Sequence, residues 1–149
     1  MCMRDEKLRA SLANAVVRLF RQVNRVHNRG LQPTGVSAEQ AHVLSVLWQM
    51  GPMTIGQLQR QLALSSATLT GAIDRMEAQE LVRRIPSPTD RRAVVLEPRP
   101  AARKRAQIEA ALDEGERRCF AALTATERAE LLRLLGKCID GLEPDASAR

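Results

Sequence analysis

With 149 residues, 44% of them hydrophobic, the chain is long enough for one domain with a real core and too short for two independent domains to be expected. Aromatic residues make up only 2%, so the core has to be built from aliphatic side chains, which favours helices over strands. A net charge of +6 and a pI near 10.2 indicate a polyanionic partner, and nucleic acid is favoured over a membrane surface because the basic residues gather around a proline-containing loop rather than on an amphipathic helix.

Two helices are predicted in the first third of the chain. From Lys7 to Asn28 apolar residues recur at steps of three and four, which is typical of one face of a long amphipathic helix. Ser37 and Gln40 form a capping box, and the helix that they start is apolar nearly all round as far as Met50. This second helix is therefore expected to be buried among others.

The stretch from residue 54 to residue 79 reads as a helix that is capped by Thr54 and Gln57, a short turn and a second helix. In the second helix, from about residue 66 to 79, Leu69, Ile73 and Met76 share one side. The other side carries small and hydroxyl-bearing residues, which suit close contact with base edges. Alternatively, it is an ordinary solvent-facing side that lacks charge. The candidate contacts on this helix are Ser66, Ala67, Thr68, Thr70 and Arg75.

A β-hairpin with a basic loop is predicted next. Two short β-like runs, 81–85 and 93–96, flank a loop of about seven residues that contains two prolines. Arg91 and Arg92 in this loop are candidates for a minor groove, while Asp90 is expected to pair with a neighbouring arginine. The segment from Arg83 to Arg105 holds eight Lys or Arg against two acids, so its net charge of +6 equals that of the whole chain.

Two more helices are expected after Pro98 and Pro100 end the hairpin. The helix from 101 to 123 has few apolar residues, whereas the last helix, capped by Thr124 and Glu127, has a broad apolar face up to Leu142. Together with the first helix they are too sparsely apolar for a separate monomeric core, so a partner chain is expected to cover them. The tail, 143–149, is expected to be disordered.

This order of parts resembles the MarR family of bacterial winged helix-turn-helix regulators. The resemblance covers almost the whole chain and is carried by GPMTIGQLQRQLALSSATLTGAIDRMEAQELVRRIPSPTDRRAVVL, with Asp90-Arg91-Arg92 the most specific piece, and by LTATERAELLRLLGKCI. It implies a mainly helical fold with a small β-wing, in one domain over 1–149. Residues 5–36 and 101–142 would be dimerisation helices, and 37–97 the winged helix-turn-helix, with its recognition helix at about 66–79 and its wing at about 82–97.

The resemblance also implies a function. We expect a cytoplasmic, non-enzymatic, sequence-specific DNA-binding regulator, a homodimeric repressor on an inverted-repeat operator in double-stranded DNA. The positions that match the family's DNA contacts are Ser65, Ser66, Thr68, Thr70 and Arg92, with Asp90 orienting Arg92; Ala67, Arg75, Arg84 and Arg91 complete the expected set.

Three residues or segments depart from the family pattern. Glu80 replaces a glycine after the recognition helix, so that helix end is expected to be remodelled. The segment 98–102 lacks the threonine that caps the fifth helix in the family. Gly71 stands where a longer polar side chain is common, which suggests fewer base contacts or a closer backbone approach.

Family members often release DNA when a small aromatic or anionic ligand binds, and others respond to thiol oxidation. Arg21 and His42 are the candidate contacts for an anionic ligand. Neither a cofactor nor a metal site is expected. Cys2 is expected to lie in a flexible terminus, and Cys119 and Cys138 are interpreted as buried, which disfavours the redox alternative. No apolar stretch approaches the ~20 residues of a membrane span.

Two other classes of function fit the sequence less well. An enzyme would need a nucleophile with its base, a phosphate-binding loop or metal-ligand spacing, and the sequence has none of these. A winged-helix module that binds only proteins would not need the concentrated positive charge.

Overall fold

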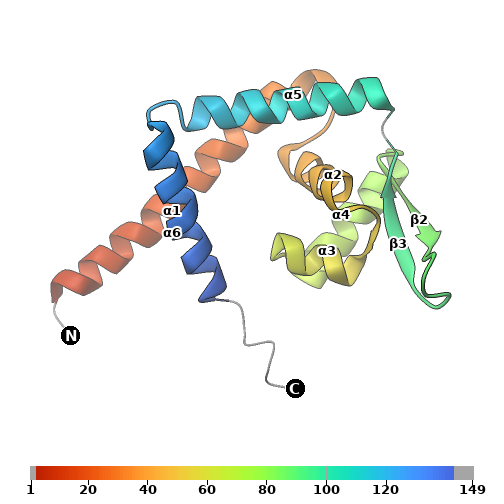
Figure 1. Cartoon of the computed structure of the whole chain (residues 1–149), viewed down its shortest axis with the longest axis horizontal. Coiled ribbons are helices and arrows are strands. Elements are labelled where there is room, and N and C mark those ends of the chain that lie inside the picture. Colours follow the sequence, from red (N-terminus) through yellow and green to blue (C-terminus); the bar gives the residue numbers. More distant parts are fainter. Residues whose placement is uncertain (1–2, 100, 143–149) are drawn as a thin grey trace.

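The structure is a computed structural model that describes residues 3–99 and 101–142 (Figure 1). The predictions for Cys2, Pro100 and the tail from residue 143 lie outside these residues, as does the side chain of Ser66. The elements in chain order are α1 (Met3–Leu31), a 3-10 turn (Gln32–Thr34), α2 (Ala38–Met50), β1 (Met53–Thr54), α3 (Ile55–Leu62), α4 (Ser66–Ala78), β2 (Val82–Pro86), β3 (Val94–Pro98), α5 (Ala102–Cys119) and α6 (Ala125–Asp140).

The polar caps predicted from the sequence start three of these helices. In α2, α3 and α6 the hydroxyl of Ser37, Thr54 or Thr124 accepts a hydrogen bond from the backbone amide three residues later, and the Gln or Glu there bonds back to the cap's own amide. Both bonds satisfy backbone donors that have no partner inside the helix. The capping boxes are therefore confirmed.

The wing is a three-stranded antiparallel sheet in the order β1-β3-β2. The hairpin of β2 and β3 was predicted, and its register pairs Val82 with Pro98 and Pro86 with Val94. The third strand was not: β1 has only two residues, Met53 and Thr54, which pair with Leu96 and Val95. So short a strand has no periodicity of its own, and the capping motif that starts α3 overlaps it.

The hydrophobic core lies between α2, α3, α4 and the three-stranded sheet. In α4, Leu69, Ile73 and Met76 are fully buried, as their spacing predicted. Buried residues from α2, α3 and the strands pack around them, and α1 and α5 add Leu31 and Ile108. Met50, at the end of the apolar α2, is more than half exposed, so the prediction that this helix is buried holds for its centre and not for its last turn.

The end of α4 keeps its usual form despite the missing glycine. Glu80 itself adopts the left-handed conformation, with φ of 56°. The amide of Glu80 donates to the carbonyl of Glu77 at 3.0 Å, and the amide of Leu81 donates to that of Met76 at 2.8 Å. This bond pair defines a Schellman motif. The expected remodelling is therefore wrong, because the chain accepts a strained residue in place of glycine.

The helices outside the winged part are arranged differently. Figure 1 shows α5 running along the top of the molecule, where it packs against α1, while α6 descends across α1 from the end of α5 that is farther from the wing. As expected from segment 98–102, the N-cap position of α5 is Ala101, which provides no side-chain cap. None of the residues of α6 is buried.

Candidate nucleic-acid interface

The start of α4 is held by two hydroxyl groups. Ser65 caps the helix, and its Oγ accepts a hydrogen bond from the amide of Thr68 at 3.3 Å and lies 2.7 Å from Thr68 Oγ1. Both side chains are exposed. Each hydroxyl keeps acceptor capacity, so the pair can hydrogen-bond to a phosphate or a base edge while it fixes the helix start.

The outward side of α4 carries only small residues in its first half. Ala67, Thr68 and Thr70 are exposed, and Gly71 is partly exposed. A Cβ atom at Gly71 would lie 3.5 Å from Nη1 of Arg75, so the guanidinium group lies back over the glycine. Side chains on a helix lean towards its N-terminus, so the side chain of Arg75 covers the residue four positions earlier. The guanidinium group therefore lies at the middle of this face.

The wing loop between β2 and β3 is closed by its own hydrogen bonds. The amide of Ser87 donates to the carbonyl of Ala93 at 2.9 Å, and the amide of Ala93 donates to that of Asp90 at 3.0 Å. The Asp90 carboxylate accepts the backbone amide of Arg92 at 3.0 Å. Among the described residues no ion pair joins Asp90 to an arginine. The expected guanidinium pairing is therefore replaced by a turn that positions Arg92 through its backbone.

Arg84 joins the wing to the recognition helix. Its Nη2 atom lies 2.6 Å from Oδ1 of Asp74, its Nη1 atom contacts the carboxylate of Glu77, and its amide donates to Glu77 Oε1 at 3.2 Å. The hydrogen bond to Asp74 is the main reason that the pKa of Arg84 is raised. The guanidinium was predicted to contact DNA, and here both of its Nη atoms are engaged by carboxylates.

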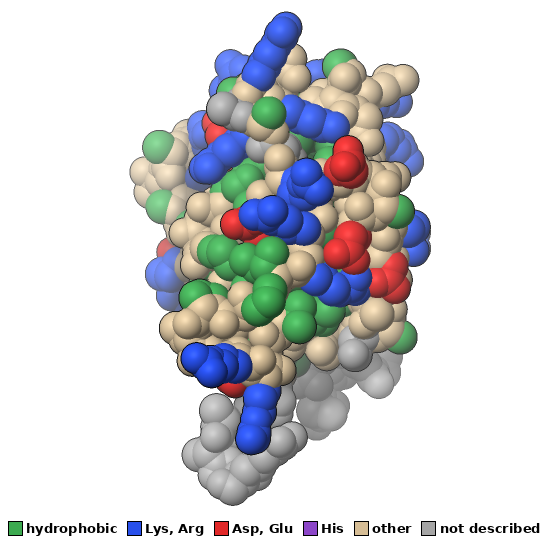
Figure 2. All heavy atoms as spheres, turned by 90° about the vertical axis from the view of Figure 1, so that its right-hand side faces the viewer, with side chains coloured by type: hydrophobic (Ala, Val, Ile, Leu, Met, Phe, Trp, Pro, Cys, Tyr) green, Lys and Arg blue, Asp and Glu red, His purple; other side chains and the backbone are tan. Residues whose placement is uncertain are grey.

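Half of the basic residues between Arg83 and Arg105 are neutralised in the same way. The ion pairs join Arg83 to Glu97, Arg84 to Asp74 and Glu77, Arg99 to Glu80 at 3.9 Å, and Arg105 to Glu109 at 2.9 Å. In the part of the chain that the structure describes, Arg91, Arg92, Arg103 and Lys104 have no such partner. Figure 2 shows the result at the wing end of the molecule: Asp and Glu side chains lie among the Lys and Arg side chains. The excess of positive charge is thus carried by fewer side chains than the sequence count implies.

A cavity of about 600 Å³ lies between α1, α2 and α5. His42, one of the two candidate ligand contacts, lines it, whereas Arg21 does not. His27 and three acids of α5 also line it and were not predicted as ligand contacts. The spacing of these acids, at steps of four and three along one helix, was a visible signal. The lining residues are Phe20, Val23, Asn24, His27, Ala38, His42, Ser45, Gln49, Glu109, Leu112, Asp113 and Glu116.

The cysteines differ from the prediction that both are buried. Cys119 is partly buried and Cys138 is exposed. Burial raises the pKa of the Cys119 thiol, which lowers its thiolate fraction and its reactivity. Within residues 3–99 and 101–142, no group of three or more His, Cys, Asp or Glu is placed to hold a metal ion. None of the helices there combines the length and apolarity of a membrane span.

Known proteins share this arrangement. Residues 36–94 match the sequence profile described as the MarR family. The regulator MgrA of Staphylococcus aureus is 32% identical over 141 residues, 93% of this chain and 91% of that protein. An uncharacterised helix-turn-helix regulator of Bacillus subtilis, YcgE, is 28% identical over 148 residues, 96% of each chain.

Solved structures of related regulators have the same fold. A mutant of MarR from E. coli in complex with operator DNA is 25% identical and superimposes with a TM-score of 0.75 over 93% of this chain and 99% of that one. The organohalide-sensing regulator RdhR, in its 2,4-dichlorophenol-bound form, has a TM-score of 0.81 over 95% of this chain and 85% of that one, and at 19% identity it shows the shared fold alone. The chain belongs to the MarR family of winged helix-turn-helix, DNA-binding transcriptional regulators and is not an enzyme.

Proposed function

We propose that the chain is a homodimeric repressor that binds an inverted-repeat operator and releases it when a small molecule binds between its helices. The observation that carries the DNA-binding part is the link through Arg84, which ties α4, with its small-residue face, to strand β2, which leads into the basic wing loop. The MarR relative crystallised with operator DNA supports the same reading.

The proposed contacts divide into two groups. Ser65, Ser66, Ala67, Thr68, Thr70 and Arg75 would face the major groove, where hydroxyl groups and a guanidinium can meet base edges and phosphates. Arg91 and Arg92 would enter the flanking minor groove, with Asp90 holding the turn. Arg84 would then act mainly by positioning both parts. A dimer would place two such units on half-sites about one helical turn apart.

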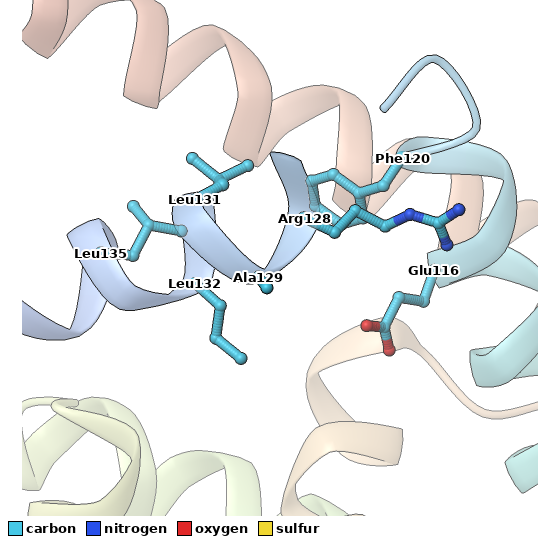
Figure 3. Close-up of a pocket in the computed structure, with 7 residues that line it drawn as sticks. All are labelled: Glu116, Phe120, Arg128, Ala129, Leu131, Leu132 and Leu135. Carbon is cyan, nitrogen blue, oxygen red and sulfur yellow. The ribbon is translucent and has the colours of Figure 1, made fainter. Parts of the chain in front are cut away.

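Dimer formation is supported by apolar residues that nothing in the described chain covers. On α1, Leu12 and Phe20 are 60% and 63% exposed, and on α6 Leu132 is 73% exposed. Figure 3 shows Leu131, Leu132 and Leu135 of α6 beside a hollow of about 220 Å³, with Phe120 and Glu116 at its other end. Exposed apolar surface of this extent marks an interaction site, and a second copy of α1 and α6 is the proposed partner. The cytoplasmic location and the repressor role stay predictions.

DNA binding is tested by fluorescence anisotropy with a random duplex at two salt concentrations. If several phosphates are contacted, the plot of log binding constant against log salt concentration should have a slope of several units. A protein-interaction module would give a flat plot and would contradict the proposal. Sedimentation equilibrium tests the dimer: Leu132→Glu should shift it towards monomer. Met50→Glu is the matched control, because Met50 is a comparably exposed apolar residue on α2, outside the proposed interface.

A further inference from the structure

The cavity between α1, α2 and α5 has a charge distribution that does not match an anionic ligand. Its volume of about 600 Å³ suits a small organic molecule. Phe20, Val23 and Leu112 supply an apolar wall, and Asn24, Ser45 and Gln49 supply neutral polar groups. No lysine or arginine appears among its described lining residues.

Three carboxylates give the cavity its charge. Glu109, Asp113 and Glu116 lie four and three residues apart on α5 and so share one side of that helix. Glu109 is already paired with Arg105 at 2.9 Å. Among the described residues, Asp113 and Glu116 have no ion-pair partner. Two carboxylates at the cavity are thus available to a ligand.

The imidazole of His27 does not reverse this charge. Burial lowers the pKa of His27, with a smaller opposing effect from Glu116, so this ring is neutral at pH 7. Its Nε2 atom is buried without a hydrogen-bond partner. His42 lines the cavity from α2, and its proximity is a further, smaller cause of the lowered pKa of His27. Among the described residues that line the cavity, an anion would meet two carboxylates of its own sign and no lysine or arginine.

We propose that this cavity binds a small organic cation, with its ammonium group between Asp113 and Glu116 and its apolar body against Phe20 and Leu112. The proposal rests on the effector site of the proposed function and names the ligand class of that site. The aromatic character expected from the family resemblance is compatible with the apolar wall; the anionic character is not.

The test uses three probes that share a phenyl ring and differ in charge: 2-phenylethylamine, phenylacetate and 2-phenylethanol. Their binding to the DNA-free protein is measured by isothermal titration calorimetry or ligand-observed NMR. The amine should bind about tenfold or more tightly than the carboxylate, and more tightly than the alcohol. Equal or tighter binding of phenylacetate, or binding of none of the three at millimolar concentration, would overturn the proposal.

Variants that remove one negative charge test whether Asp113 and Glu116 bind the ammonium group. Asp113→Asn and Glu116→Gln should each weaken amine binding several-fold and leave the alcohol unchanged. Glu114→Gln is the matched control, since this carboxylate lies on the same helix but pairs with Arg117 and is not part of the lining. Equal effects of all three variants would also overturn the proposal. Because DNA is absent, a negative result here leaves the salt-dependence test of DNA binding untouched.

Discussion

Arg84 reaches from strand β2 to the recognition helix, where its Nη2 atom lies 2.6 Å from Oδ1 of Asp74. Its Nη1 atom contacts Glu77, one turn further along the same helix. The side chain of Arg84 is 30% exposed, so these charge-assisted bonds are only partly screened by solvent. This guanidinium group therefore ties α4 to the wing in addition to their shared core packing.

We expect Arg84→Gln to weaken operator binding without changing its salt dependence. If the guanidinium positions α4 and the wing rather than a phosphate, the affinity falls while the number of neutralised phosphates stays constant. Arg91→Gln is the comparison, since Arg91 is exposed and has no ion-pair partner in the described chain. If Arg91 contacts a phosphate, Arg91→Gln should lower the slope of log affinity against log salt concentration by about one.

Anisotropy titrations at several salt concentrations measure both quantities. A drop in slope for Arg84→Gln that equals the drop for Arg91→Gln would show that Arg84 is a direct phosphate contact. Urea unfolding should show Arg84→Gln to be destabilised by about 1–2 kcal/mol, from the lost charge-assisted hydrogen bonds discounted for exposure.

The elements with local signals were predictable. Caps such as Ser37 with Gln40, and the spacing of Leu69, Ile73 and Met76, depend on residues a few positions apart, so the sequence shows them directly. Strand β1 was missed because two residues carry no period and form a strand only by pairing with Leu96 and Val95.

The site was harder to predict because its geometry depends on pairs distant in sequence. The charge count from Arg83 to Arg105 ignored Asp74, Glu77 and Glu80, which lie outside that segment and neutralise two of its arginines. The cavity is formed by residues from three helices, and of the two candidate ligand contacts only His42 lines it.

In the wing turn, we expect the side-chain oxygen of Asp90, as a hydrogen-bond acceptor, to matter more than its negative charge. Asp90→Asn keeps a side-chain oxygen for the amide of Arg92 and should leave operator affinity nearly unchanged, whereas Asp90→Ala should weaken it by about 1 kcal/mol. Arg92→Ala should cost roughly 1–3 kcal/mol if the guanidinium enters the minor groove. Anisotropy with the cognate operator distinguishes these variants. Equal losses for Asn and Ala at position 90 would show that the charge of Asp90 matters instead.

Glu80→Gly should stabilise the protein. An L-residue in the left-handed region costs about 1–2 kcal/mol, which glycine avoids. The larger conformational entropy of glycine in the unfolded chain offsets roughly 0.5–1 kcal/mol of this gain. A net gain of about 0.5–1 kcal/mol is therefore expected from urea unfolding. The 3.9 Å ion pair to Arg99 is exposed, and its loss should have little effect. Gln79→Gly, at φ of −90°, is the control and should destabilise instead.

His27 should make stability fall on the acid side of neutrality. Burial lowers its pKa below the ordinary 6.5, so the unfolded chain takes up a proton at a higher pH than the folded protein does. Its contribution is fully present above pH 6.5 and is lost as the pH falls below that value. His27→Gln should flatten this part of the curve of unfolding free energy against pH. An unchanged slope in the variant would assign the acid sensitivity to other groups.

The crossing of α1 and α5 depends on the absence of one side chain. A Cβ atom at Gly115 would lie 2.1 Å from Cδ2 and 2.7 Å from Nε2 of His27, so the imidazole ring lies directly on the backbone of α5. Gly115→Ala must displace the ring or separate the helices, and we expect a destabilisation of about 1–3 kcal/mol from overpacking. Gly56→Ala on α3, outside the proposed dimer interface, is the matched control: its added Cβ would meet only Thr54 Oγ1, at 4.0 Å, and better helix propensity should stabilise it by about 0.5–1 kcal/mol. The double variant Gly115→Ala with His27→Ala should recover part of the loss, because the colliding ring is gone. If Gly115→Ala unfolds at the same urea concentration as the wild type, the close packing of α1 on α5 at His27 is not part of the folded protein.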